Sequence, residues 1–278
     1  MSMKEKRMIK AWLRGFFTVL FGLIYLFPLY IAVVNSFKPY SEIVKSPLTL
    51  TLHPTFENFA EAFRSSNIVS LYGTSILITF SSVAMLVLIS STAAYVIIRR
   101  NNGICKFLYA FALIGIMVPP VVTLVPSIKT LSMLHLMYKP SGLLMFYGGA
   151  YFSTTIFLYT GFINSIPESL DESAYIDGAN TITIFFRIIF PLLKPCTATA
   201  IILMGMWIWN DFLNPLYILG STAGRTITTG IYNAIGAYTS KWNLVFANVI
   251  LASLPIVILY LCMQKQFMNG LTAGAVKG

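Results

Sequence analysis

The chain has 278 residues, of which 57% are hydrophobic and only 10% charged, and its formal net charge is +10 at pH 7. Soluble domains usually carry about 25% charged residues, so this composition excludes an ordinary water-soluble globular protein. The basic residues flank apolar runs instead of gathering on one polar face, which argues against nucleic acid as a partner. The composition therefore predicts an all-α integral membrane protein in contact with lipid.

Six apolar runs are long enough to cross a hydrocarbon layer of about 30 Å as helices. In chain order they lie near 13–36, 70–98, 105–128, 141–163, 192–214 and 244–264. The first run is too long for a signal-peptide h-region and no small-x-small site follows it, so we expect an uncleaved helix. We predict one transmembrane domain over 1–278, with a core of about 70–264.

The distribution of Lys and Arg predicts the orientation of the six spans. An internal N-terminus places 12 of the 19 basic residues on the cytoplasmic side, as the positive-inside rule requires. The cluster at 4–14 and the pair Arg99-Arg100 contribute most to this bias. We therefore expect a multi-pass protein of a prokaryotic cell membrane with both termini in the cytoplasm.

The spans lack the groups that power transport. Ion-coupled transporters usually carry ionisable residues at mid-membrane, and none is evident there. The sequence has no G-x-x-x-x-G-K-[ST] loop for nucleotide phosphates. Its cysteines and histidines do not have the spacing of zinc ligands. We expect no catalytic residue, metal or cofactor in this chain, so energy for active transport would come from another protein.

The predicted cytoplasmic loop 164–191 is the most distinctive segment. Four of the nine acidic residues lie in it, all between 168 and 177. Ser165 and Glu168 have capping-box spacing, which predicts a short helix from Ile166. Asp177-Gly178 would end this helix, because glycine readily takes the left-handed conformation. An ordinary amphipathic loop helix would explain these features equally well.

A helical wheel gives this predicted helix two different sides. The apolar side carries Ile166, Leu170 and Ala174, and the other side carries Glu168, Asp171, Glu172 and Tyr175. A second short helix is expected from about Asn180 to Phe190, ahead of Pro191. The sequence thus predicts a helix–turn–helix on the inner surface of the membrane.

The loop resembles the EAA loop of ABC importer permeases. In that family E-A-A is followed after three residues by G, after nine more by I, and after one further residue by L-P or a variant. Here serine replaces the first alanine and Phe190 precedes the proline. The resemblance implies a coupling helix that docks on a separate ATPase subunit. The residues assigned to this contact are Glu172, Ser173, Ala174, Asp177, Gly178 and Pro191.

Two further segments are similar to the maltose-transporter-type carbohydrate permeases, and specifically to the smaller permease partner. One is the aromatic–Asn–acidic run at 207–212. The other is the C-terminal tail, for which the resemblance implies an ATPase contact by Leu271, Thr272, Gly274 and Lys277. It also implies a type I ABC importer permease fold. The implied partners are a homologous second permease, two ATPase subunits that hold ATP and Mg, and an extracytoplasmic sugar-binding protein that meets the loop 215–243.

The run at 207–212 also supplies candidate residues for the substrate path. A sugar offers an apolar ring face and hydroxyl groups, which suit aromatic rings and amide or carboxyl groups respectively. The candidates are Trp207, Trp209, Asn210 and Asp211. The tryptophans also suit an interfacial aromatic belt, and Asp211 could instead cap a contact between helices.

The sequence therefore predicts a permease subunit, without an ATPase of its own, that moves a sugar or oligosaccharide across the membrane. One alternative is a permease of the same class for another solute, such as glycerol phosphate or a polyamine. A phosphate substrate should require Arg or Lys along the spans. The other alternative is a passive channel or structural membrane protein, which would leave the acidic helix–turn–helix unexplained.

Overall fold

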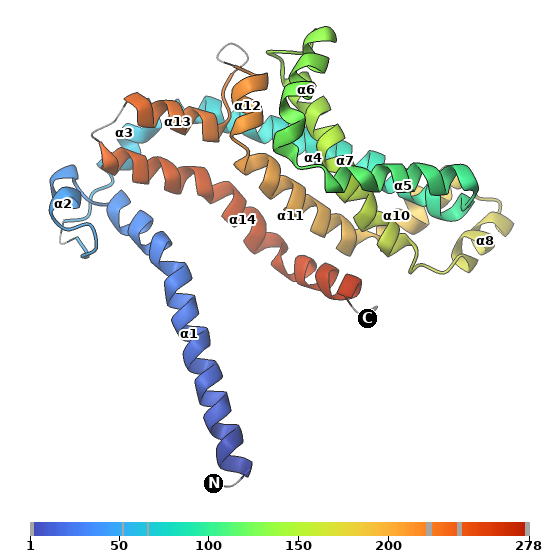
Figure 1. Ribbon diagram of the computed structural model, residues 1–278, viewed down its shortest axis with the longest axis horizontal. Coiled ribbons are helices and arrows are strands. Elements are labelled where there is room, and N and C mark those ends of the chain that lie inside the picture. The colour runs from blue at the N-terminus through green and yellow to red at the C-terminus, as the bar shows by residue number, and fades with distance from the viewer. Residues whose placement is uncertain (1–2, 52, 66, 221–223, 238–240, 276–278) are drawn as a thin grey trace. The chain divides into compact units, whose positions relative to one another are not determined.

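The computed structural model describes residues 3–51, 53–65, 67–220, 224–237 and 241–275, and every element within these ranges is helical (Figure 1). The chain divides into two compact units. The first consists of Met1–Ile68 and Ile231–Leu254, and the second of Val69–Gly230 and Pro255–Gly278. The described part is thus all-α, as its composition predicts.

The first unit begins with a long helix and continues with short ones. Its elements are α1 (Met3–Ser36), α2 (Tyr40–Lys45), α3 (Glu57–Ser65), the end of α13 (Ile227–Ala237) and the first part of α14 (Trp242–Ala275). Asn58 ties α3 to the end of α1, because its Nδ2 donates to the carbonyls of Ser36 and Lys38 at 2.9 and 2.8 Å. Asn243 Nδ2 donates to Asn58 Oδ1 at 2.7 Å and so joins α14 to the same cluster.

The second unit contains most of the predicted spans. Its elements are α4 (Ile68–Arg100), α5 (Gly103–Met117), α6 (Pro120–Met133), α7 (Pro140–Ile163), α8 (Ser169–Ile176), α9 (Thr181–Ile184), the π-helical η1 (Phe185–Ile189), α10 (Phe190–Leu192), α11 (Lys194–Asn210), α12 (Leu213–Ile218), the start of α13 and the rest of α14. The helix α7 is central, since it packs against α5, α6, α11 and α12. Its buried tyrosines Tyr147 and Tyr159 belong to one apolar core with residues of α4 and α11.

Among the described residues, fewer than six helices are long and apolar enough to span a membrane. Among the residues described, Trp12–Ser36, Ile68–Arg100 and Trp242–Lys265 are long and apolar enough, and counting each of two bent helix pairs as one span gives five. The helix α7 coincides with the predicted run at 141–163, but glycine, serine, threonine and tyrosine dilute its apolar residues. The number six and the placement of the termini therefore remain predictions.

The run at 105–128, predicted as one span, is broken. The axes of α5 and of α6 from Val121 onward differ by 114°. The break lies at Val118 and Pro119, whose ψ angles of 117° and 131° are extended. Pro119 and Pro120 cause it, because proline lacks an amide donor and disfavours helical backbone in the residue before it.

The run at 192–214 is likewise divided. The segment Thr181–Leu192 meets α11 at an angle of 75°. At its other end α11 stops at Asn210, because Asp211 has extended backbone, and α12 begins at Leu213. Both breaks lie beside the two groups of residues that the sequence singles out.

Candidate functional site

The loop between α7 and α11 folds as a helix–turn–helix, but its first helix begins at Ser169 and not at Ile166. The predicted capping box is absent, since Ser165 Oγ donates back to the Phe162 carbonyl at 2.6 Å. Its backbone amide donates to the same carbonyl at 3.0 Å. Ser165 thus completes the last turn of α7, and Glu168 precedes α8 without capping it through its side chain.

The predicted glycine turn is confirmed. Gly178 has φ +83°, and its amide donates to the Tyr175 carbonyl at 3.0 Å. The amide of Ala179 donates to the Ala174 carbonyl, also at 3.0 Å. This pair of bonds is the Schellman motif, which satisfies carbonyls at the end of a helix. The turn fixes the direction in which the chain leaves α8.

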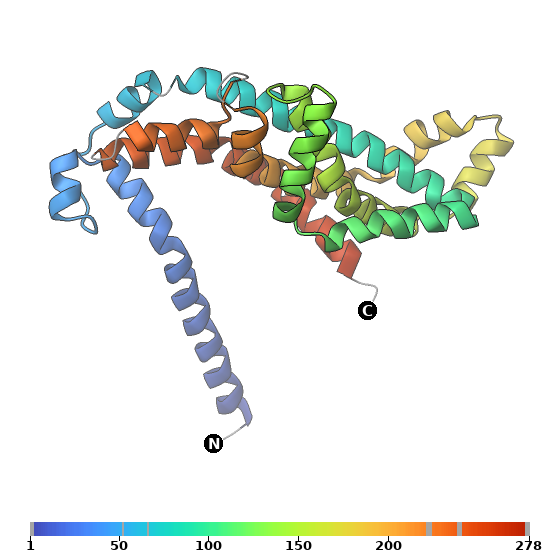
Figure 2. The ribbon, with the colours of Figure 1, turned by 45° about the horizontal axis from the view of Figure 1, so that its top comes forward.

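The second helix starts where it is expected. Asn180 caps it, because its side chain accepts from the Thr183 amide at 2.8 Å. Within the predicted range the helix passes through the π-helical η1 before it reaches α10 and Pro191. Single π-helical turns inside helices often occur at functional sites. Figures 1 and 2 show this loop, with α8, near the junction of α4 and α5.

Asp171 lies on the packed side of α8, against the wheel prediction. Its Oδ1 accepts from the Tyr95 hydroxyl at 2.6 Å, and its Oδ2 lies 2.8 Å from a guanidinium nitrogen of Arg99. Ala174 is buried beside it, whereas Leu170, predicted on the apolar side, is exposed. The wheel fails here because the partners that draw Asp171 inward come from α4.

Most of the residues assigned to the ATPase contact are accessible. Glu172, Ser173, Asp177, Gly178 and Pro191 are exposed, and only Ala174 is buried. The exposed side of α8 also carries Tyr175 and Ile176, at 71% and 84% of their full exposure. This acidic and apolar surface is free to meet another protein.

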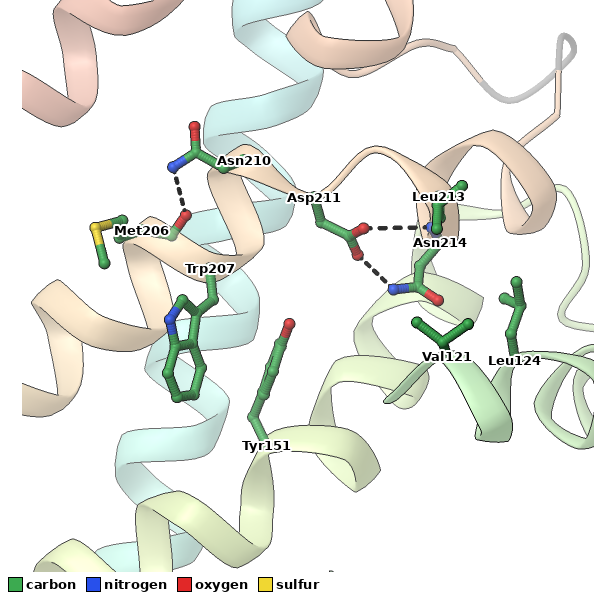
Figure 3. A pocket seen from close by; sticks show the side chains of 9 residues that line it. All are labelled: Val121, Leu124, Tyr151, Met206, Trp207, Asn210, Asp211, Leu213 and Asn214. Carbon is green, nitrogen blue, oxygen red and sulfur yellow. Dashed lines mark hydrogen bonds between the residues drawn. The ribbon is translucent and has the colours of Figure 1, made fainter. Parts of the chain in front are cut away.

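A second candidate site is a cavity of about 420 Å³ in the second unit (Figure 3). Its lining comes from α6, α7, the break between α11 and α12, and those two helices: Val121, Leu124, Tyr151, Met206, Trp207, Asn210, Asp211, Leu213 and Asn214. Three of the four candidate substrate-path residues are therefore brought together. Tyr151 and Asn214 are additional members that sequence reasoning missed.

Trp209 does not join this cavity. It is buried, with its ring centroid 6.3 Å from that of Tyr72 in a stacked arrangement. Two residues correspond to about 200° around a helix, so Trp207 and Trp209 face opposite sides of α11. The ring centroid of Trp207 instead lies 5.5 Å from that of Tyr151, and both rings line the cavity.

Asp211 is held in place at the break after α11. Its Oδ2 accepts from the Tyr147 hydroxyl at 2.9 Å and from Asn214 Nδ2 at 2.7 Å, and its Oδ1 from the Asn214 amide at 3.3 Å. Thr228 Oγ1 donates to its backbone carbonyl at 2.7 Å. Four helices, α7, α11, α12 and α13, thus meet at one residue. The result is a fixed carboxylate beside two aromatic rings, a combination that can bind a sugar's hydroxyls and ring face.

The predicted C-terminal contact residues lie beyond the last described side chain of α14. Leu271, Thr272 and Gly274 fall within the backbone of α14, but the described side chains end at Lys265, and Lys277 lies outside the described residues. Within the part of the chain that is described, no three His, Cys, Asp or Glu residues are grouped as a metal site would require.

The described residues thus form an all-helical domain with broken apolar helices and an exposed loop helix. Residues 87–271 match the family described as "Binding-protein-dependent transport system inner membrane component". Because the match covers most of the chain, the protein belongs to this family of ABC importer permeases. The predicted resemblance to such permeases is thereby confirmed.

Curated relatives cover nearly the whole chain. The probable starch degradation products transport system permease protein AmyC of Thermoanaerobacterium thermosulfurigenes is 33% identical, over 97% of this chain and 98% of its own. The multiple sugar-binding transport system permease protein MsmG of Streptococcus mutans is 34% identical, over 99% of each chain. The melibiose/raffinose/stachyose import permease protein MelC of Bacillus subtilis is 34% identical, over 90% of this chain and 91% of its own.

The fold also matches a solved structure. A chain from a bacterial ABC transporter involved in the import of the acidic polysaccharide alginate superposes with a TM-score of 0.84, covering 96% of this chain and 99% of its own. The two sequences are 19% identical. At this identity the comparison establishes the common fold.

Proposed function

We propose that this chain is the permease subunit of an ABC importer that carries an uncharged sugar or oligosaccharide. The observation that carries the substrate class is the cavity around Asp211. Its lining combines the rings of Trp207 and Tyr151 with a carboxylate and two amides. The names of the three relatives, all sugar permeases, support the same class.

The charge of the cavity favours a neutral solute over a phosphate. Asp211 is the sole charged residue among the nine that line it, with no Lys, Arg or His in that set. A phosphate ester would need such cations to offset its charge. Glycerol phosphate is therefore the weaker alternative, and family membership argues against a passive channel or a purely structural role.

The complete importer would contain several partners. We infer a homologous second permease, two ATPase subunits that bind ATP and Mg, and an extracytoplasmic binding protein. Six spans forming one transmembrane domain, with both termini in the cytoplasm, would place α8 beside the ATPases. Glu172, Ser173, Asp177, Gly178 and Pro191 would then make the contact, with Ala174 packed beneath them. The end of α14 would supply the further contact assigned to Leu271, Thr272, Gly274 and Lys277.

Reconstitution tests this proposal directly. The chain would be co-expressed with its second permease, its ATPase and its binding protein, purified as a complex and placed in proteoliposomes. We expect uptake of a labelled neutral oligosaccharide that requires both ATP and the binding protein. A Walker-lysine variant of the ATPase is the control and should abolish uptake. Equal uptake without ATP, or uptake of glycerol phosphate in preference to the sugar, would contradict the proposal.

A further inference from the structure

We propose that the ion pair between Arg99 and Asp171 fastens the coupling loop to α4, and that α4 transmits movement of the loop to the Asp211 cavity. Arg99 and Tyr95 are thus positioning residues for transport. The inference rests on the proposed function, because it concerns how ATP-driven movement of α8 reaches the substrate path.

Arg99 joins the last turn of α4 to two parts of the loop. Its guanidinium lies 2.8 Å from Asp171 Oδ2 in α8. Two of its nitrogens also donate to the carbonyl of Ile166, in the connection before α8, at 3.3 Å. The side chains of Arg99 and Asp171 are 13% and 16% exposed, so solvent screens their attraction only partly. A planar guanidinium can serve both partners at once, which an ammonium group does less well.

Tyr95, one turn earlier on α4, holds both arms of the helix–turn–helix. Its hydroxyl donates to Asp171 Oδ1 at 2.6 Å, while its ring centroid lies 5.2 Å from that of Phe185 in η1. Tyr95 and Phe185 are buried. A displacement of α8 or η1 must therefore either move the end of α4 or break these contacts.

Near its other end, α4 is connected through α13 to Asp211 at the cavity. Ser75 Oγ accepts from the Ile227 amide at 2.8 Å, and both residues are buried. The next residue, Thr228, donates to the backbone carbonyl of Asp211 at 2.7 Å. One hydrogen-bonded connection thus runs from α4 through the start of α13 to the break after α11.

Between these two attachments α4 is continuous. From Ser75 to Arg99 it contains no proline, and at the α-helical rise this stretch is about 36 Å long. The spans α1 and α14 each contain a proline, and α5 and α6 are broken apart. Rigid secondary-structure elements can carry coupling over such a distance, and α4 is suited to this role.

A double-mutant cycle tests the ion pair in the assembled importer. Arg99→Ala and Asp171→Ala would each be measured for sugar uptake and ATP hydrolysis in proteoliposomes, with the binding protein present. We expect uptake per ATP to fall at least fivefold in each, and the double variant to be no worse than either single one, because the two residues act through one contact. Arg100→Ala, at the exposed neighbouring arginine, should stay within twofold of the wild type.

Tyr95→Phe is a conservative second variant that should still fold, because it removes one hydroxyl and keeps the ring against Phe185. It should lower uptake per ATP at least twofold while the amount of co-purified ATPase is unchanged. Wild-type uptake per ATP in both Arg99→Ala and Tyr95→Phe would overturn this inference and leave the proposed function intact. So would a double variant whose loss of uptake per ATP equals the product of the two single losses, because the residues would then act independently. Absence of ATP-dependent uptake by the wild-type complex would instead refute the proposed function.

Discussion

The sequence predicts the role of a residue correctly where its interaction partners are close to it in the chain. Gly178 was identified because Asp-Gly after a short helix is a local stop signal, and its φ of +83° agrees. The helical wheel predicts the wrong side of α8 for Asp171, since its partner Tyr95 lies 76 positions earlier in the chain. Arg99 was visible only as a topology signal for the same reason. Short-range chemistry is therefore more predictable here than long-range pairing.

The positive φ of Gly178 predicts that any side chain at this position is unfavourable. A Cβ there would meet nothing within 4 Å, so Gly178→Ala costs about 1–2 kcal/mol through backbone conformation alone. We expect the turn after α8 to open and uptake per ATP to fall severalfold, measured in proteoliposomes. Gly161→Ala in α7 is the matched control, because that glycine also has open space but no positive φ. Equal behaviour of the two variants would remove Gly178 from the coupling role.

The elements were predicted well in position but not in continuity. Apolar length located α1, α4, α7 and α14, because a helix that spans lipid must hold a long unbroken apolar run. The apolar run at 105–128 predicts a single span, whereas the structure has a 114° break between α5 and α6 at Pro119 and Pro120. Proline in a membrane helix can produce a kink or a break, and the local sequence does not distinguish them.

At the break after α11, Asp211 is predicted to be essential for the arrangement of helices around the cavity. Asp211→Ala leaves the buried Tyr147 hydroxyl without its acceptor, which costs about 1–3 kcal/mol. We expect sugar uptake to fall at least tenfold while co-purification of the ATPase is retained. Asp211→Asn keeps one acceptor oxygen and should fall less. If Asp211→Ala transports normally, the cavity is not on the substrate path.

For the whole molecule, the composition predicts a membrane protein and the loop spacing predicts its family, while the described helices give three to five candidate spans instead of the predicted six. The membrane orientation can be tested with single-cysteine variants of a chain from which Cys105, Cys196 and Cys262 have been replaced. Lys139→Cys, in the exposed connection before α7, should react with a membrane-impermeant maleimide in intact cells. Arg100→Cys should react only after the cells are opened. The reverse pattern would invert the topology and place α8 outside.

Arg99 is both a predicted signal for membrane insertion and a residue that contacts the coupling loop. In the predicted orientation the same guanidinium would help to retain one end of α4 in the cytoplasm during insertion, and in the folded protein it contacts Asp171 and Ile166 of the loop. A lysine at this position would keep the charge that guides insertion but could not form the same forked contact with Asp171 and Ile166. Arg99→Lys should therefore separate the two roles, giving a correctly inserted permease that is weakly coupled to ATP hydrolysis by its ATPase.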